Sequence, residues 1–198
     1  MDQTAVINEF KAAKAILKGH FILSSGLHSD TYLQCARALM DPKRASRLCS
    51  SLADKVRATL GDNSFDIVIA PAMGGVIVGY EMARQLNVEG MFCERKDGSF
   101  SLRRGFAIEP ERNRVLVVED VVTTGKSSLE AIECIQNAGG NVVGEACLIN
   151  RNANNNPLGN TPLIALTELT VQSYKEDDLP PELQAIPAEK PGSRFLKA

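Results

Sequence analysis

The sequence predicts an α/β protein built on a doubly wound, mostly parallel sheet. Short apolar runs that suit strands alternate along the chain with stretches of helical periodicity. The runs span 66–70, 90–93, 115–118 and 142–149, and the helical stretches span about 75–86 and 127–138. Residues 115–118 are apolar at every position, which suits a parallel strand buried on both faces. This alternation favours parallel strands joined by right-handed crossovers.

Two further helices and an extended segment precede the first predicted core strand. Residues 4–17 have one apolar face at helical spacing. The second helix begins with Asp41 as its cap and Pro42 in its first turn, and it ends at Gly61. Residues 20–35 between these helices are predicted to be extended around a turn.

The 198 residues fit one domain, with a core at about 41–165. Residues 1–40 and 166–198 lie outside the core alternation. By elimination, we expect them to form a small hood over one end of the sheet.

The composition excludes several classes of protein. Lys and Arg number 22 against 24 Asp and Glu, so the net charge of −2 argues against a broad basic surface for nucleic acid. No apolar run approaches the ~18 residues of a membrane helix, and the polar N-terminus does not resemble a signal peptide. The five Cys form no C-x-x-C pair, which favours reduced thiols. We therefore expect a cytoplasmic protein that binds neither nucleic acid nor membrane.

The most informative stretch is the predicted strand 115–118 and the residues after it. Glu119 and Asp120 are followed by a hydroxyl-rich loop, 123–127, that leads into a helix. The free N–H groups of a helix start bind phosphate, and carboxylates accept hydrogen bonds from vicinal hydroxyls. The predicted ligand is therefore a sugar phosphate at the carboxyl edge of the sheet. A buried strand with a capped helix and chance acids is the alternative interpretation, and Asp120 excludes a Walker A loop, which needs glycine there.

At these residues the chain resembles the type I phosphoribosyltransferases, whose signature of apolar strand, two acids, two apolar residues and T-T-G-x-S matches 115–127 in full. The resemblance implies that 5-phosphoribosyl 1-diphosphate (PRPP) binds with Mg²⁺ and donates its ribosyl group to a nitrogenous base, releasing pyrophosphate. The PRPP-binding residues it implies are Arg95, Lys96, Glu119, Asp120, Val121, Val122, Thr123, Thr124, Gly125, Lys126 and Ser127. The implied pyrophosphate loop comprises Ala72, Met73, Gly74 and Gly75. Mg²⁺ would be carried by PRPP near Asp120, with no direct protein ligand.

Further segments are similar to the orotate phosphoribosyltransferase family. Residues 21–32 resemble its hood segment, 94–106 its flexible basic loop with Gly98 and Gly105 as flex points, and 187–194 its P-x-x-K-P-G-S-R ending. The orotate-binding residues implied are Thr123, Arg151, Ser25 and Gly26. The catalytic residues implied are Lys96, Asp120 and Arg103. In that family the basic loop acts across a homodimer.

The sequence departs from the family pattern at several positions. Ser24 and Gly74 stand where many members carry lysine, and Ser99 and Ser101 replace later basic loop residues. Arg103 and Arg104 are candidates to supply the missing charge. A solvated surface role is the alternative for the basic loop residues, and a surface ion pair is the alternative for Arg151. For His20 and His28 a structural or solvent-facing role is favoured, because a general base needs an oriented partner.

Two other functions are carried as alternatives. A purine-base phosphoribosyltransferase would lack an arginine for a base carboxylate and would need neither the hood nor the K-P-G-S-R ending. A non-catalytic regulator of the same fold would normally bring a nucleic-acid surface, which this acidic chain lacks.

Overall fold

The computed structural model describes residues 1–23, 25–152 and 156–191. The strands of its main sheet are β3 (Ile67–Pro71), β4 (Glu89–Lys96), β5 (Ser99–Leu102), β6 (Arg114–Val122), β7 (Asn141–Asn150) and β8 (Leu163–Glu168). They follow the order β5-β4-β3-β6-β7-β8, and every neighbouring pair is parallel except β4 and β5. The predicted mostly parallel α/β sheet is thus confirmed.

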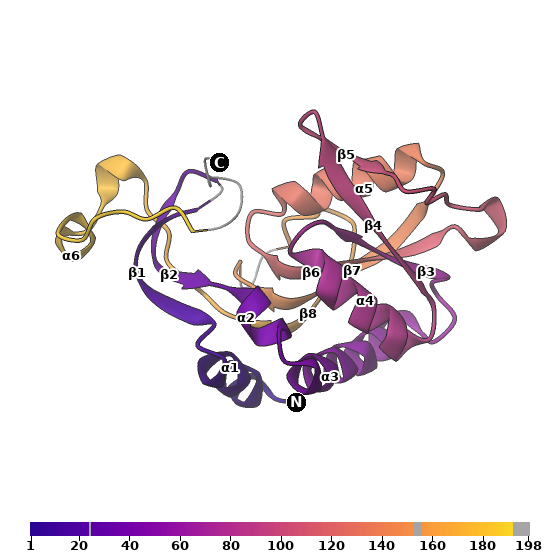
Figure 1. The fold of residues 1–198 in the computed structure, drawn as a ribbon, viewed down its shortest axis with the longest axis horizontal. Helices are drawn as coiled ribbons and strands as arrows, with labels where there is room; N and C mark the ends of the chain where they lie inside the picture. The colour runs from indigo at the N-terminus through magenta and orange to yellow at the C-terminus, as the bar shows by residue number, and fades with distance from the viewer. Residues whose placement is uncertain (24, 153–155, 192–198) are drawn as a thin grey trace.

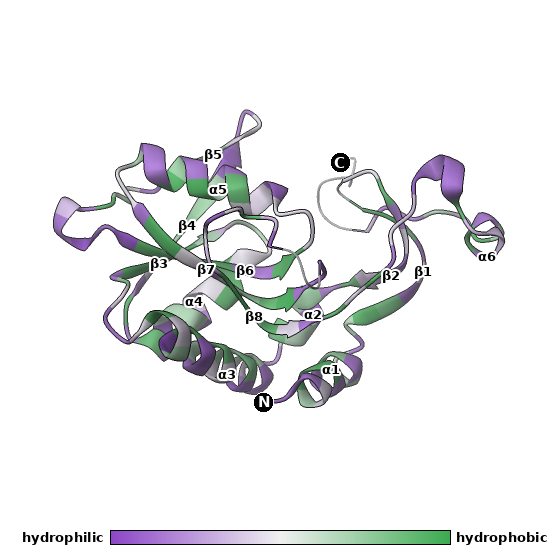
Figure 2. Cartoon of the chain, turned by 180° about the vertical axis from the view of Figure 1, so that it is seen from behind, coloured by the Kyte–Doolittle hydropathy of each residue, from purple (hydrophilic) through white to green (hydrophobic). Residues whose placement is uncertain are grey.

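Helices cover both faces of this sheet (Figure 1). Helices α3 (Pro42–Leu60) and α4 (Gly75–Leu86) pack on one face, and α5 (Lys126–Asn137) packs on the other. Along β6 the side chains alternate: Leu116 is buried beneath α3 and α4, whereas Val115 and Val117 are buried beneath α5. Hydrophobic colour accordingly follows the central strands in Figure 2, and hydrophilic colour marks the outer side of α3.

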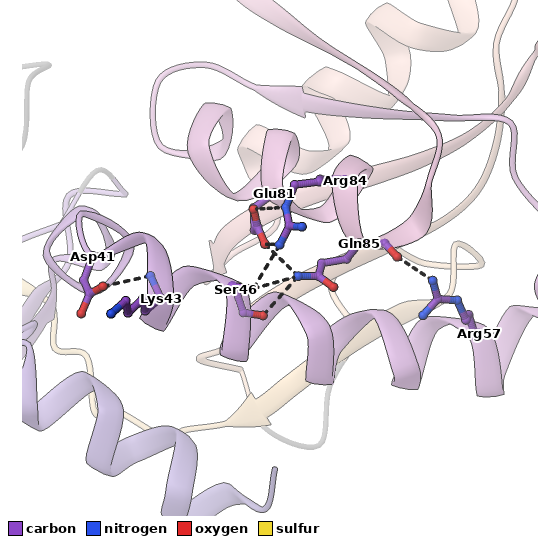
Figure 3. A network of polar contacts seen from close by, with 7 residues as sticks. All are labelled: Asp41, Lys43, Ser46, Arg57, Glu81, Arg84 and Gln85. Atoms are coloured by element: carbon purple, nitrogen blue, oxygen red, sulfur yellow. Dashed lines mark hydrogen bonds and ion pairs between the residues drawn. The ribbon is translucent and has the colours of Figure 1, made fainter.

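A polar network fixes α4 against α3 (Figure 3). Arg84 pairs with Glu81 at 2.6 Å and also donates to the hydroxyl of Ser46 at 3.1 Å. The hydrogen bonds from Arg84 hold the pKa of Glu81 below its ordinary value. Gln85 donates to the same hydroxyl at 3.1 Å, and its carbonyl accepts from Arg57 at 2.6 Å. The network therefore orients α4, the helix that begins directly after the predicted pyrophosphate loop.

A hairpin from the N-terminal region and the C-terminal segment form a small unit beside the main sheet (Figure 1). Strands β1 (Ile16–Ile22) and β2 (His28–Leu33) form an antiparallel pair. The C-terminal segment runs along both of them, bridging His28 to Tyr174 and Phe21 to Glu189. The predicted hood therefore combines N-terminal and C-terminal segments. Of the predicted K-P-G-S-R ending, residues 192–194 lie outside the described residues, as does Ser24.

A buried histidine pair joins the hood to this C-terminal segment. His20 Nε2 lies 2.6 Å from His28 Nδ1, and His20 Nδ1 lies 2.8 Å from the Ile186 carbonyl. Because a carbonyl only accepts, His20 carries its proton on Nδ1, and in the neutral pair its Nε2 accepts from His28. Both rings are buried. The structural role predicted for the two residues agrees with this geometry, although the sequence did not pair them.

The N-terminal region differs from its prediction in two respects. Helix α1 (Gln3–Ala12) ends before residue 17, because Lys14 adopts a left-handed φ of +52° and Leu17 then pairs with Tyr32 in the hood sheet. Helix α2 (Cys35–Leu39) was not predicted.

The remaining described elements are short. They are the 3₁₀ turns η1 (Pro110–Arg112) and η2 (Glu176–Asp178) and the helix α6 (Pro181–Gln184). In the described part of the chain, no helix has the length and apolar character needed to cross a membrane.

The contact between α4 and β3 gives a test of this packing. A Cβ atom at Gly79 would lie 2.6 Å from Cβ of Ala70, closer than two carbon atoms can approach. We expect Gly79→Ala to lower the free energy of unfolding by about 1–3 kcal/mol despite alanine's higher helix propensity. In an Ala70→Gly background the same change should be neutral or stabilising. Denaturant unfolding of wild type, the two single variants and the double variant measures the coupling between the two positions. An equal effect of Gly79→Ala on unfolding free energy in both backgrounds would contradict the contact.

Candidate active site at the carboxyl edge of the sheet

The two predicted acids lie in the last part of β6, where the strand reaches the carboxyl edge of the sheet. Glu119 pairs with Cys147 of β7, and Val117 pairs with Ile69 of β3. Alternation along the strand points Glu119 toward the α5 face and Asp120 toward the α4 face. A Cβ atom at Gly74 would lie 3.1 Å from the Asp120 carboxylate. The acid pair and the loop after β3 therefore lie next to each other.

Both carboxyl groups are partly exposed and have raised pKa values. Burial is the main cause for Glu119, and the charges of Asp120 and Glu145 add to it. Burial also raises the pKa of Asp120, and the backbone N–H of Val121, which donates to it at 2.8 Å, opposes the increase. Neither acid has an ion-pair partner within the described ranges. Such a pair favours ligands that bring hydrogen-bond donors or positive charge.

The predicted phosphate loop is a bend between β6 and α5. Gly125 caps the helix with φ +73°, and within the described structure no side chain caps the first turn of α5. Thr124 and Lys126 are exposed at this turn. A Cβ atom at residue 125 would lie 2.9 Å from Pro157, so only glycine lets the loop pack there. The turn therefore offers backbone N–H groups and hydroxyls to an anion.

The predicted pyrophosphate loop leads from β3 into α4. The N–H of Ala72 donates to the carbonyl of Cys93 at 2.7 Å, which fixes the start of the loop. Met73 is exposed, and the peptide bond before it is cis. Gly75 begins α4, and a Cβ atom there would lie 3.2 Å from the carbonyl of Val118. The loop thus packs directly on the acid-bearing end of β6.

Arg151 follows β7 and lies beside the end of β6. Its backbone N–H donates to Val122 at 2.8 Å, and its guanidinium reaches the Ser29 hydroxyl at 3.4 Å. The side chain is buried, its Nε has no partner among the described residues, and burial lowers its pKa. A surface ion pair, the alternative interpretation, does not fit this burial. An unsatisfied buried guanidinium is suited to receive a planar anion.

The hood contributes residues that sequence reasoning did not assign to the site. Burial and the charge of Asp120 raise the pKa of Tyr32, and the buried Cys35 thiol hydrogen-bonds to Asp120. The sequence predicts that the cysteines are reduced thiols and assigns no role at the site to Cys35. The family hood pattern that includes Tyr32 was the available signal. Ser25 and Gly26 occupy the exposed tip of the β1–β2 turn, on the same hairpin as Ser29.

The prediction that residues 94–106 form a loop is wrong for part of this segment. Residues 99–102 form β5, which pairs with β4 in a hairpin, because buried Phe100 packs against α5. Arg95 forms an ion pair with Glu130 of α5 and covers the Phe100 ring. Strand β4 continues for three residues, or about 10 Å, past Cys93, the residue that pairs with Pro71 at the end of β3.

The other basic residues of the hairpin differ in their surroundings. Arg103 and Arg104 both pair with Glu94, at 3.6 and 3.1 Å. Lys96 is exposed at the tip. The predicted flex points, Gly98 and Gly105, have φ of +89° and +80° at the two turns that bound β5.

The described residues contain no cluster of three or more side chains suited to hold a metal ion. At the site, the groups available to a metal ion are the two adjacent carboxylates of Glu119 and Asp120. Magnesium commonly binds through one or two carboxylates together with substrate phosphates. The residues present therefore fit a metal ion that arrives with a phosphorylated ligand.

A mostly parallel sheet with two adjacent acids and a glycine turn at its carboxyl edge, and a hood beside it, is the architecture of the type I phosphoribosyltransferase class. The phosphoribosyl transferase domain family matches residues 37–177. An orotate phosphoribosyltransferase of Maricaulis maris is 54% identical over 99% of this chain and 100% of its own length. One from Caulobacter vibrioides is 51% identical over the full length of both chains. The chain belongs to the orotate phosphoribosyltransferase family.

Solved structures agree with this assignment of the fold. The crystal structure of orotate phosphoribosyltransferase from Aeropyrum pernix has a TM-score of 0.65 at 25% identity, covering 82% of this chain and 93% of that one. A crystal structure of adenine phosphoribosyltransferase has a TM-score of 0.63 at 15% identity, covering 82% and 99%. The second likeness concerns the fold alone.

The raised pKa of Glu119 predicts a stability change with pH. The unfolded chain ionises this group near its ordinary pKa of 4.5, whereas the folded protein ionises it at higher pH. Stability is therefore lost as the pH rises from 4.5 toward the folded pKa. Glu119→Gln should raise the melting temperature at neutral pH by about 2–4 °C per kcal/mol regained. The gain should shrink as the pH falls from the folded pKa toward 4.5, and a gain in melting temperature that does not vary with pH would refute the assignment.

Proposed function

We propose that this chain transfers the 5-phosphoribosyl group from PRPP to orotate at the carboxyl-edge site. The products are orotidine 5′-monophosphate and pyrophosphate, in the synthesis of pyrimidine nucleotides. The observation that carries the proposal is the buried guanidinium of Arg151, with its unsatisfied Nε beside the phosphate turn. Membership of the orotate phosphoribosyltransferase family supports the same substrates.

PRPP has three polar parts, and the site offers one feature for each. The turn Thr123–Ser127 and the start of α5 would bind the 5′-phosphate, with Val121 and Val122 supplying the strand end that carries it. Glu119 and Asp120 would accept hydrogen bonds from the ribose hydroxyls. The loop Ala72–Gly75 would donate N–H groups to pyrophosphate. The contact between Gly74 and Asp120 supports this order, because it brings the last two features together.

Orotate would lie between Arg151 and the hood. Its carboxylate matches the planar fork of the guanidinium and would satisfy the free Nε. Thr123 lies one residue beyond the backbone contact of Arg151, and Ser25 and Gly26 lie on the hairpin that Arg151 touches through Ser29. A base without a carboxylate would leave the buried charge unpaired, which is the physical source of selectivity.

The reaction breaks the bond between the anomeric carbon and pyrophosphate while the base nitrogen attacks. Positive charge develops on the sugar, and negative charge develops on the leaving group. The carboxylates of Glu119 and Asp120 would stabilise the sugar cation, with Asp120 catalytic. Lys96 and Arg103 would neutralise pyrophosphate, and Arg95 would assist. Mg²⁺, carried by PRPP near Asp120, would supply further neutralisation of the leaving group.

We propose a homodimer in which the β4–β5 hairpin serves the partner's site. Met73 in the pyrophosphate loop and Ile77 and Tyr80 on α4 are exposed apolar side chains at helical spacing. Exposed apolar clusters of this kind mark contact surfaces. Because Arg95 is held by Glu130 of its own subunit, exposed Lys96 is the residue of the hairpin tip best placed to reach another subunit.

We further propose a single domain, with the core at 41–165, in a cytoplasmic enzyme that binds neither nucleic acid nor membrane. All five cysteines are unpaired, four of them buried, which suits a reducing compartment. The net charge of −2 supports the exclusion of a nucleic-acid partner.

An assay with several bases tests the proposed reaction. Orotate absorbance should fall rapidly with PRPP and Mg²⁺, whereas adenine, guanine, hypoxanthine and uracil should not react. Turnover of a purine instead would support the purine-enzyme alternative, and no turnover of any base would support the non-catalytic regulator.

Arg151→Gln should raise the KM for orotate about 30-fold or more while the KM for PRPP changes little. Exposed Arg112→Gln is the matched control, and an unchanged orotate KM in Arg151→Gln would reject the role of Arg151.

Mixing two inactive variants tests the shared site. A protein with Lys96→Ala and Arg103→Ala lacks the two cations proposed to neutralise pyrophosphate, and Asp120→Asn disables the sugar site. In a mixed dimer, one site would combine the intact acids of the first variant with the intact hairpin of the second. An equal mixture should therefore recover about a quarter of the wild-type kcat after subunit exchange. No recovery, with mixed dimers confirmed by mass spectrometry, would mean that the hairpin serves its own subunit.

A further inference from the structure

A buried acid lies beneath the first turn of α5, outside the residues used so far. Glu145 is fully buried on β7, within an otherwise mostly apolar strand. The hydroxyl of Ser128, itself buried, donates to Glu145 Oε1 at 2.7 Å. Glu145 Oε2 is also buried and has no hydrogen-bond partner in the described part of the chain. A buried carboxyl group without full hydrogen bonding is costly and calls for a specific explanation.

The register of the sheet connects Glu145 to the active site. Glu145 pairs with Val117 of β6, and two residues further along the same face Cys147 pairs with Glu119. This is the face that α5 covers. Ser128 follows directly after the predicted phosphate turn. Glu145 therefore contacts the helix start on one side and lies diagonal to Glu119 on the other.

Among the described residues, the electrostatic surroundings of Glu145 contain acids and no compensating base. Glu119 on β6 and Cys147 on β7 respond to its charge, and each has its pKa raised by it. Helix α5 contributes the Ser128 hydroxyl, β8 contributes the apolar register partner Leu163, and α3 covers the opposite face. Burial raises the pKa of Glu145 to about 7, and the hydrogen bond from Ser128 opposes the increase. Its charge state therefore changes near neutral pH.

We propose that Glu145 is a positioning residue for the PRPP site, which fixes the first turn of α5 through Ser128 and weakens PRPP binding when it is ionised. This inference rests on the proposed function, because it assigns PRPP to the phosphate turn. A neutral Glu145 leaves the helix start positive, and an ionised Glu145 adds a negative charge beneath bound phosphate. The low local dielectric makes that charge effective across the turn.

Linkage fixes the sign of the effect. Bound PRPP is highly negative, so it favours the protonated form of Glu145 and raises the pKa of this group further. The contribution of Glu145 to PRPP affinity is therefore greatest when the pH is well below 7. It declines as the pH rises through about 7. By reciprocity, PRPP binding near this pH takes up protons at Glu145.

The test compares wild type with Glu145→Gln, whose side-chain oxygen can still accept from Ser128 but carries no charge. Titration calorimetry with PRPP and Mg²⁺, in buffers of different ionisation enthalpy, gives both Kd and proton uptake. The ratio of the wild-type Kd to the variant Kd cancels the titration of PRPP itself. This ratio should rise about fivefold between about pH 6 and pH 8.5, and the variant should lose the Glu145 share of proton uptake.

Two further variants keep the test specific. Ser128→Ala removes the hydrogen bond that lowers the pKa of Glu145, so the decline in PRPP affinity should move to higher pH. Glu133→Gln makes the same chemical change on the exposed side of α5 and should behave as wild type. A Kd ratio that does not vary with pH, in a Glu145→Gln protein that melts like a folded protein, would overturn the proposal. Absence of PRPP binding by wild type at every pH would instead be a failure of the proposed function.

Discussion

The close approach of the β3–α4 turn to the end of β6 is the constraint on which the site depends. Gly74 lies against the Asp120 carboxylate, and Gly75 lies against the Val118 carbonyl. A Cβ atom at position 74 would crowd the Asp120 carboxylate and one at position 75 would crowd the Val118 carbonyl, so the turn and the strand end are in direct contact. The contact is possible because β3 and β6 are parallel neighbours whose carboxyl ends reach the same edge. The fold thus brings together residues nearly fifty positions apart in the sequence.

Charge is distributed unevenly around this contact. Burial raises the pKa of Glu119, Asp120 and Glu145, and the charges of Asp120 and Glu145 raise the pKa of Glu119 further. Arg151 is a buried cation at the same edge of the sheet. None of these groups is fully compensated in the described structure, which costs folding stability. A ligand with vicinal hydroxyls, phosphate and a carboxylate would supply the missing partners. Binding of such a ligand would therefore recover part of this cost in folding stability as binding free energy.

The sequence predicted the features that depend on local pattern. Four features could be predicted because each is short and chemically distinct: the apolar strand, the acid pair, the glycine turn and the hood motif. The hairpin at 95–102 was missed because Phe100 forms a strand only by packing on α5, a contact distant in sequence. The same holds for Cys35 and Glu145, whose surroundings come from other elements. Nothing local in the sequence distinguishes a buried glutamate from an exposed one.

Under the proposed mechanism, the positions of the cations favour a contribution from a second subunit. Arg95, Arg103 and Arg104 are each paired with a glutamate of their own chain, so their charge is largely compensated where they stand. Lys96 lies beyond these pairs at an exposed tip. The exposed apolar side chains of α4 continue into the pyrophosphate loop at Met73. A partner bound on these side chains would therefore lie next to the leaving group, where an additional cation is required.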